Sequence, residues 1–184
     1  MRGCLATDHE IYCFRLAFWI KDLETSIFKP NFENLIMFSE ESAKKRIMEM
    51  WNRLKKTNRH KISLKRKWTS IFPSCAGIYI VFEKGKLVYV GETGNLKDRM
   101  KDLGRTVNHT LRRAVGNEKF CYIKGWEKAT SKRRFNDKIE KLITGYFRKN
   151  MEVSFLAIPL GRKELEEWII EKFKPHYNKK EGRK

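Results

Sequence analysis

The sequence predicts a mixed α/β fold (of the α+β type), in which a small mixed sheet of three to four strands is flanked by helices. Two apolar runs, 78–82 and 87–90, stand on either side of a short glycine-containing turn, which is the pattern of a β-hairpin. A third run with strong β character covers 152–158. Residues 134–148 and 163–173 instead repeat their apolar side chains at helical spacing.

The charge of the chain indicates a polyanionic partner. Its 184 residues hold 41 Lys and Arg against 22 Asp and Glu, a formal net charge of +19. Self-repulsion of this size works against compactness, so its usual reason is a polyanion. Nucleic acid fits, because neutralised phosphates release counterions, and an anionic membrane surface is the competing interpretation. No stretch reaches the length of a membrane span, so we expect a soluble, cytoplasmic protein.

The strongest basic run lies before the hairpin. Residues 44–67 hold eleven Lys and Arg residues against the single acid Glu49. A solvated helix face with a basic linker would explain it, but we favour a clamp on a phosphate backbone. The residues expected to bind DNA are Lys44, Lys45, Arg53, Lys55, Lys56, Lys65, Arg66, Lys67 and, further along, Arg112 and Arg113.

Two helices are expected before the hairpin. The first covers about residues 8–24, where aromatic and apolar residues gather. The second starts at Ser39, a good N-cap followed by two acids, and ends near Lys56. We therefore divide the chain into a basic, mainly helical N-terminal extension, residues 1–72, and a domain that contains the sheet, residues 73–184.

Shorter signals follow the hairpin. Asn95 is a good N-cap for a helix that ends at Gly104, and Asn108 for a short helix that ends at Gly116. Residues 119–124 favour one further strand.

The hairpin and the turn after it carry the most specific motif of the chain. G-I-Y opens the first strand, Y-V-G closes the second, and T-x-x-L-x-x-R follows. This pattern resembles the GIY-YIG nuclease superfamily. The residues that carry the resemblance are Gly77, Ile78, Tyr79, Tyr89, Val90, Gly91, Thr93, Leu96 and Arg99. Both tyrosines have the parity of the polar positions, so we expect them on the less buried face of the sheet.

A second motif near the C-terminus supports the resemblance. Glu166 lies on the expected last helix, and the sequence P-H-Y-N, which ends at Asn178, follows it. Members of the superfamily close in a similar way, with a glutamate, two apolar residues and P-x-Y-N. Two separated motifs in the right order are far more specific than either one alone. The resemblance covers about residues 75–178 and leaves the N-terminal region unmatched.

The resemblance implies hydrolysis of phosphodiester bonds by a one-metal mechanism. Glu166 would hold Mg²⁺ (or Mn²⁺), and Arg99 would fork onto a phosphate oxygen. Tyr79 is assigned as the base that activates water and Tyr89 as its supporter, with the reverse order left open. A phenol needs nearby cations to lower its pKa for this task. Three further residues would support the site: Gly91, Thr93 and Asn178.

Two positions depart from the usual motif. Glu92 stands where some relatives carry a basic residue, and we interpret it as a solvated residue at the end of a strand. Leu103 stands where many relatives carry His or Tyr, one turn after the arginine. His109 is the best substitute for that role, because it begins the short basic helix.

The predicted function is a metal-dependent DNA endonuclease that resembles small restriction-type members. Homing or mobile-element nucleases and repair nucleases share the same core. The alternative from another class is a non-catalytic nucleic-acid-binding module on the same fold. Double-strand cutting would require a homodimer or two sequential nicks, and the sequence does not choose between them.

Overall fold

The expected hairpin lies at the centre of the fold. In the computed structural model, which describes residues 40–178, β2 (Gly77–Glu83) and β3 (Lys86–Thr93) pair antiparallel. Lys84 and Gly85 connect them with φ values of 50° and 81°. Positive φ at both central residues is what a type I′ hairpin turn requires. The expected helix over 8–24 and the Ser39 cap lie outside the described residues.

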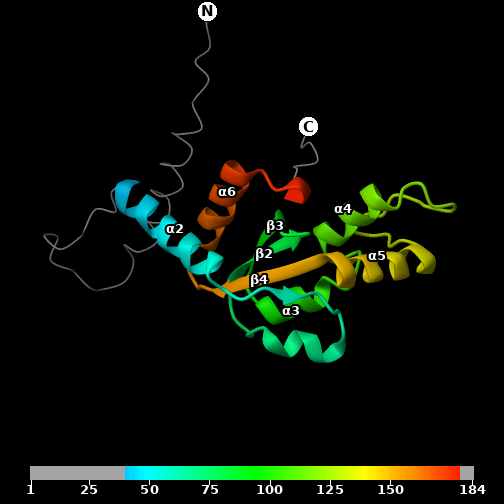
Figure 1. Ribbon diagram of the computed structural model, residues 1–184, viewed down its shortest axis with the longest axis horizontal. Coiled ribbons are helices and arrows are strands. Elements are labelled where there is room, and N and C mark those ends of the chain that lie inside the picture. The colour runs from blue at the N-terminus through cyan, green and yellow to red at the C-terminus, as the bar shows by residue number, and fades with distance from the viewer. Residues whose placement is uncertain (1–39, 179–184) are drawn as a thin grey trace, which may run out of the picture. The chain divides into compact units, whose positions relative to one another are not determined.

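The sheet has four strands in the order β1-β4-β2-β3, and all its pairings are antiparallel (Figure 1). β4 (Met151–Ala157) pairs with β2, as the apolar run over 152–158 suggested. β1 (His60–Lys61) pairs with the other side of β4. Two residues are too short to leave a period in the sequence, so this strand was not expected. The predicted fold class is confirmed.

Helices cover both faces of the sheet, which explains why β2 is apolar at successive positions (Figure 1). One core includes Ile78, Ile80 and Val90 with residues of α2 and α6, and the other includes Tyr79 and Val81 with residues of α3, α4 and α5. A strand that is buried on both faces needs apolar side chains on both. The bounds are α2 Glu40–Lys55, η2 Arg66–Ile71, α3 Leu96–Asp102, α4 Thr110–Lys119, α5 Asp137–Asn150, α6 Arg162–Phe173 and η3 His176–Asn178.

The strand expected over 119–124 is wrong. α4 continues through Gly116 to Lys119, and short turns follow, in which Ile123 N donates to Phe120 O and Trp126 N to Ile123 O. Gly116 does not end the helix and instead packs closely against a neighbouring ring. A Cβ atom at this position would overlap the Phe135 ring.

The two motif tyrosines do not lie on a less buried face. Tyr79 has no exposed surface and Tyr89 is 6% exposed, and both belong to the larger core cluster. The parity argument located them together on one face but misjudged its burial, because α3, α4 and α5 cover that face as well. All described residues belong to one compact unit, Ser39–Lys184. The functional division at residue 72 stays a prediction.

No helix within residues 40–178 is both long and apolar enough to cross a bilayer.

Gly91 lets the Tyr79 hydroxyl reach its place in the sheet. A Cβ atom at Gly91 would lie 2.5 Å from the Tyr79 hydroxyl oxygen, whereas a Cβ atom at Gly94 would meet nothing within 4 Å. We expect Gly91→Ala to lower the free energy of unfolding by about 1–3 kcal/mol, the usual cost of overpacking. Guanidinium denaturation measures this, with Gly94→Ala as the matched control. Equal stability of the two variants would contradict the close packing.

Candidate active site

Two side chains, Arg99 and His109, meet at the Tyr79 hydroxyl. Arg99, on α3, donates from Nε to this oxygen at 3.1 Å. His109, the residue before α4, places Nε2 at 2.9 Å from it. Arg99 also donates from Nη1 to the carbonyl oxygen of Asn108 at 3.2 Å. The structure therefore brings together three of the five predicted catalytic residues by direct hydrogen bonds.

The directions of these hydrogen bonds follow from the donors available. A guanidinium only donates, so the Tyr79 oxygen accepts from Arg99. We assign the Tyr79 hydroxyl as the donor to His109 Nε2, which requires a neutral imidazole with its proton on Nδ1. Burial and the charges of Arg99, Arg113 and Arg112 all hold the pKa of His109 well below its usual range. His109 Nδ1 is buried and has no hydrogen-bond partner among the described residues.

Tyr89 lies beside this group and nearer the surface. Its ring centroid is 6.1 Å from that of Tyr79 and 5.9 Å from that of His109. Burial raises the pKa of both tyrosines, and for Tyr79 the neighbouring Tyr89 raises it further. The charge of Arg99 acts in the opposite direction but does not outweigh burial. The charge of Arg99 by itself therefore leaves the pKa of both phenols above the ordinary value.

Glu166 lies on α6, which covers the face of the sheet opposite to the one that carries Tyr79 and Tyr89. Burial raises the pKa of this half-buried carboxyl to about 7, and the charge of Glu92 adds to the shift. A hydrogen bond from the Glu92 backbone opposes it. The charge of Glu166 in turn raises the pKa of Tyr89, so the tyrosine and the carboxylate lie within electrostatic reach of each other.

Glu92 is not a solvated strand end, contrary to expectation. Arg162, in the first turn of α6, donates from Nε to Glu92 Oε2 at 2.6 Å and from Nη1 to the Pro159 carbonyl. This ion pair ties α6 to β3 one helical turn before Glu166. Sequence reasoning missed Arg162, because nothing local relates it to a carboxylate 70 positions away.

The residues present fit a single hard divalent cation. Among residues 40–178 no three His, Cys, Asp or Glu side chains cluster, so a site with several protein ligands is not formed there. Glu166 is a carboxylate that burial and Glu92 make costly to ionise, and a cation relieves that cost. A single carboxylate suits Mg²⁺, which keeps several of its waters.

The predicted support residues Asn178 and Thr93 form hydrogen bonds with β3 and with the turn that follows it. Asn178 accepts from Val90 N through Oδ1 and donates to Val90 O through Nδ2, both at 2.8 Å. Thr93 Oγ1 accepts from Asn95 N at 3.1 Å, and Asn95 caps α3 as expected, by accepting from Asp98 N. Leu103 is fully buried and makes only core contacts of the kind expected for leucine.

Arg112 does not belong to a DNA-binding surface, contrary to expectation. Its side chain is 1% exposed and forms an ion pair with Glu140 at 2.8 Å. Arg113 is partly buried and donates to the carbonyl oxygens of Thr106 and Val107. The Arg112 guanidinium is used inside the protein, so it is not available to phosphates. Arg113 keeps part of its side chain at the surface, and its DNA contact stays a prediction.

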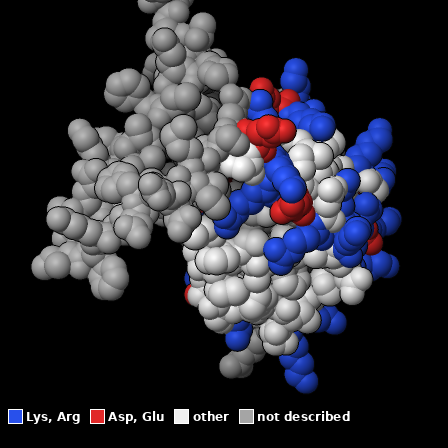
Figure 2. All heavy atoms as spheres, turned by 90° about the vertical axis from the view of Figure 1, so that its left-hand side faces the viewer, with Lys and Arg blue, Asp and Glu red and all other residues white. Residues whose placement is uncertain are grey.

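The other residues of the predicted clamp lie at the surface where they are described. Figure 2, which faces the side on the left of Figure 1, shows Lys and Arg side chains gathered over its upper and right-hand part, with fewer acidic ones. The side chain of Arg66 is not described. The exposed members are Lys44, Lys45, Arg53, Lys55, Lys56, Lys65 and Lys67.

The electrostatic contact between Glu92 and Glu166 gives a direct prediction. Glu92→Gln keeps an oxygen that accepts from Arg162 but removes the like charge, so the pKa of Glu166 should fall below about 7. A ¹³C NMR titration of the side-chain carboxyl carbons measures this. Glu171→Gln, an exposed position further along α6, is the control. An unchanged Glu166 pKa in Glu92→Gln would contradict the contact.

Comparison with known proteins identifies the family of the chain. A model of the GIY-YIG catalytic domain matches residues 75–180. Among solved structures, the chain is similar to the GIY-YIG N-terminal endonuclease domain of UvrC from Thermotoga maritima bound to magnesium. The identity is 19%, over 61% of this chain and 93% of that chain, with a TM-score of 0.33. A point mutant of that domain, bound to the catalytic divalent cation, is 18% identical over 61% of this chain and 92% of that chain, with a TM-score of 0.34. No curated protein matches. Since the family match covers more than half of the sequence, the chain belongs to the GIY-YIG family of nuclease domains.

Proposed function

We propose that the chain is a metal-dependent endonuclease that hydrolyses DNA phosphodiester bonds. The observation that carries this proposal is the convergence of Tyr79, Arg99 and His109 by direct hydrogen bonds, with Tyr89 and Glu166 within electrostatic reach. Phosphodiester hydrolysis needs a positioned water, a proton acceptor and positive charge for the phosphate. These five side chains supply the corresponding groups.

Arg99 is the residue proposed to contact the phosphate. It is partly exposed, and the Tyr79 oxygen and the Asn108 carbonyl fix its guanidinium in one orientation. A guanidinium that is fixed before substrate binds loses little freedom when it donates to a phosphate oxygen. Arg99 lies close enough to Tyr89 to affect its pKa, so a phosphate bound by Arg99 would lie near the second tyrosine of the motif.

Tyr89 is the tyrosine proposed to orient the attacking water. It has some exposed surface and senses the charges of both Arg99 and Glu166, whereas Tyr79 has no exposed surface. We therefore reverse the order in which the sequence ranked the two tyrosines. Tyr79 holds Arg99, and its hydroxyl proton lies against His109 Nε2, a neutral acceptor.

Glu166 is the residue proposed to hold Mg²⁺ or Mn²⁺. A divalent cation bound there supplies positive charge that favours an ionised phenol and offsets charge on the phosphate. Burial and the charge of Glu92 raise the pKa of Glu166, and the charge of Arg99 does not offset them, so a cation bound there would favour the ionised carboxylate.

DNA is proposed to lie along the basic side chains of residues 44–67 and to reach the site from there. The exposed cations on α2 and around η2 provide sequence-independent phosphate contacts. A restriction-type role, a cytoplasmic location and cutting by a homodimer extend this proposal. The second candidate, a nucleic-acid-binding module without activity, is favoured only by the same basic surface.

Cleavage of supercoiled plasmid tests the activity. We expect nicking with Mg²⁺ and none with EDTA. Glu166→Gln, Arg99→Gln and Tyr89→Phe should each slow nicking by about 10²-fold or more, since each removes a group that acts on the reacting atoms. Glu164→Gln, an exposed carboxylate on the same helix, is the control and should nick at the normal rate. Plasmid binding without nicking, whichever divalent cation is supplied, would establish the binding module instead.

The salt dependence of DNA binding tests the basic surface. Replacing Lys65 and Lys67 by Gln should weaken binding at all sequences. It should also make the slope of log K against log salt shallower by up to about 1.8, from roughly 0.9 per phosphate contact. The pair Lys84 and Lys86, exposed at the β2–β3 turn, gives a control with the same loss of charge. The two double variants would show equal slopes if binding depended only on net charge.

A further inference from the structure

The segment between α3 and α4, residues 103–109, carries two of the contacts that build the site. The carbonyl of Asn108 accepts from Arg99, and the ring of His109 meets the Tyr79 hydroxyl. The segment contains turns but no helix or strand. Its backbone forms only local turn hydrogen bonds, such as Asn108 N to Arg105 O, so side-chain contacts connect it to the rest of the domain.

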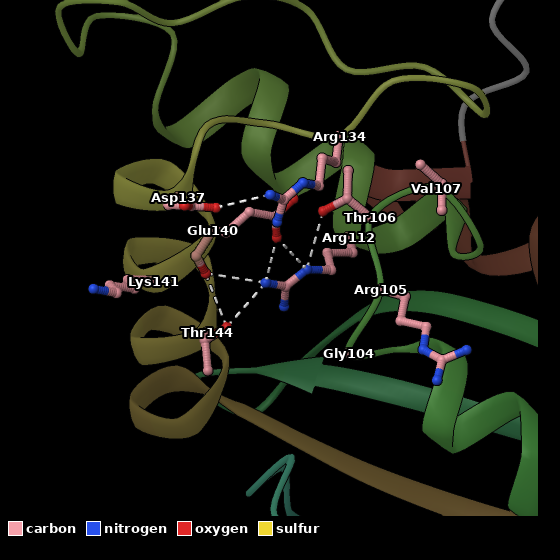
Figure 3. Close-up of a pocket in the computed structure, with 10 residues that line it drawn as sticks. All are labelled: Gly104, Arg105, Thr106, Val107, Arg112, Arg134, Asp137, Glu140, Lys141 and Thr144. Carbon is pink, nitrogen blue, oxygen red and sulfur yellow. Dashed lines mark hydrogen bonds and ion pairs between the residues drawn. The ribbon is translucent and has the colours of Figure 1, made fainter.

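Arg112 connects this segment to α5. Its Nε donates to Thr106 Oγ1 at 3.1 Å. Its Nη2 donates to Glu140 Oε2 at 2.8 Å, to the Glu140 carbonyl at 3.0 Å and to Thr144 Oγ1 at 2.9 Å. Figure 3 shows this guanidinium between Thr106 on one side and the α5 residues on the other. Glu140 is itself held, because its Oε1 accepts from Phe135 N.

Arg113 holds the same segment from the other side of α4. Its Nη1 donates to the carbonyl oxygens of Thr106 and Val107 at 3.0 and 2.9 Å. On the α3 side, Asn108 Nδ2 donates to Asp102 Oδ1 at 2.9 Å. These hydrogen bonds therefore hold the segment at both ends. Among them, only those of Arg112 connect the segment to α5.

The wall of the segment that faces α5 borders open space. A pocket of about 480 Å³ lies between them, lined by Gly104, Arg105, Thr106 and Val107 on the segment side and by Glu140, Lys141 and Thr144 on α5. Apolar packing does not fill this gap, so the hydrogen bonds of Arg112 bridge it. A buried ion pair is weak evidence for stability, but it can specify one arrangement.

We propose that Arg112 and Glu140 are positioning residues of the active site, which fix residues 105–109 so that His109 and the Asn108 carbonyl meet Tyr79 and Arg99. This inference rests on the proposed nuclease function. It gives Arg112 a role that its place in a basic helix did not suggest. The pair acts through the segment and touches neither substrate nor the reacting groups.

Arg112 also affects the pKa of His109. The imidazole faces Tyr79 from β2, Tyr89 from β3, Arg99 from α3, and Arg112 and Arg113 from its own helix. Among these groups the three arginines oppose its protonation. Removing Arg112 should therefore both loosen the ring and raise the pKa of His109 toward its ordinary value.

Arg112→Met in the full chain tests the proposal through turnover and DNA affinity. We expect kcat for plasmid nicking to fall about tenfold or more, the usual effect of misplacing a site, while Kd for DNA and its salt dependence stay within about twofold. Arg134→Met is the matched control, because Arg134 lines the same pocket but pairs only with exposed Asp137 at 3.0 Å. A weaker Kd with a shallower salt slope would instead make Arg112 a DNA contact and overturn the proposal.

An NMR titration of the His109 ring provides a readout that needs no activity. Arg112→Met should shift its midpoint upward, and His109→Asn assigns the resonance. Because losing one partner of a buried pair can unfold a protein, the double variant Arg112→Met with Glu140→Leu is measured as well. If a folded variant lowers only Tm and leaves kcat and the titration unchanged, the pair is merely structural. Because loss of the Arg112 charge alone would move the titration, nuclear Overhauser contacts between the His109 and Tyr79 rings decide on positioning, also if the wild type does not nick: they should weaken in Arg112→Met, and unchanged contacts would overturn the proposal.

Discussion

The site depends on one buried hydroxyl. The Tyr79 oxygen accepts from Arg99 and lies 2.9 Å from His109, in a place where no side chain at residue 91 would fit. A buried polar atom without partners is costly, so the surrounding elements are arranged to supply them. α3 brings the arginine and the start of α4 brings the histidine. The position of each helix is therefore coupled to the first strand of the hairpin.

Much of this was predictable, for a physical reason. The hairpin, the Asn95 cap and the last helix are set by local signals, and the structure confirms them. The motif residues also share short, fixed spacings on either side of one turn, so their proximity follows from the hairpin itself. Glu166 and Asn178 are remote in sequence, and only the resemblance to a family related them to the hairpin.

The misjudged residues share a different property. Arg112 and Glu92 were assigned to solvent because charged side chains are usually exposed. Each has its partner far away in the sequence, Glu140 for Arg112 and Arg162 for Glu92. No local pattern reveals such a partner, because the direction of a long side chain is decided by tertiary packing. The strand expected over 119–124 is absent because α4 continues through Gly116, which packs against Phe135, and local sequence does not reveal that contact 19 positions away.

The contact of Asn178 with Val90 has a consequence for the sheet as a whole. β3 is an edge strand, with β2 as its only neighbour in the sheet of the described residues. Exposed edges invite pairing with another chain, which leads to aggregation or strand exchange. The side-chain amide of Asn178 binds both the N–H and the C=O of Val90, as a neighbouring strand would do. A side chain near the end of the domain thus caps the open edge and makes it a poor template for a second copy.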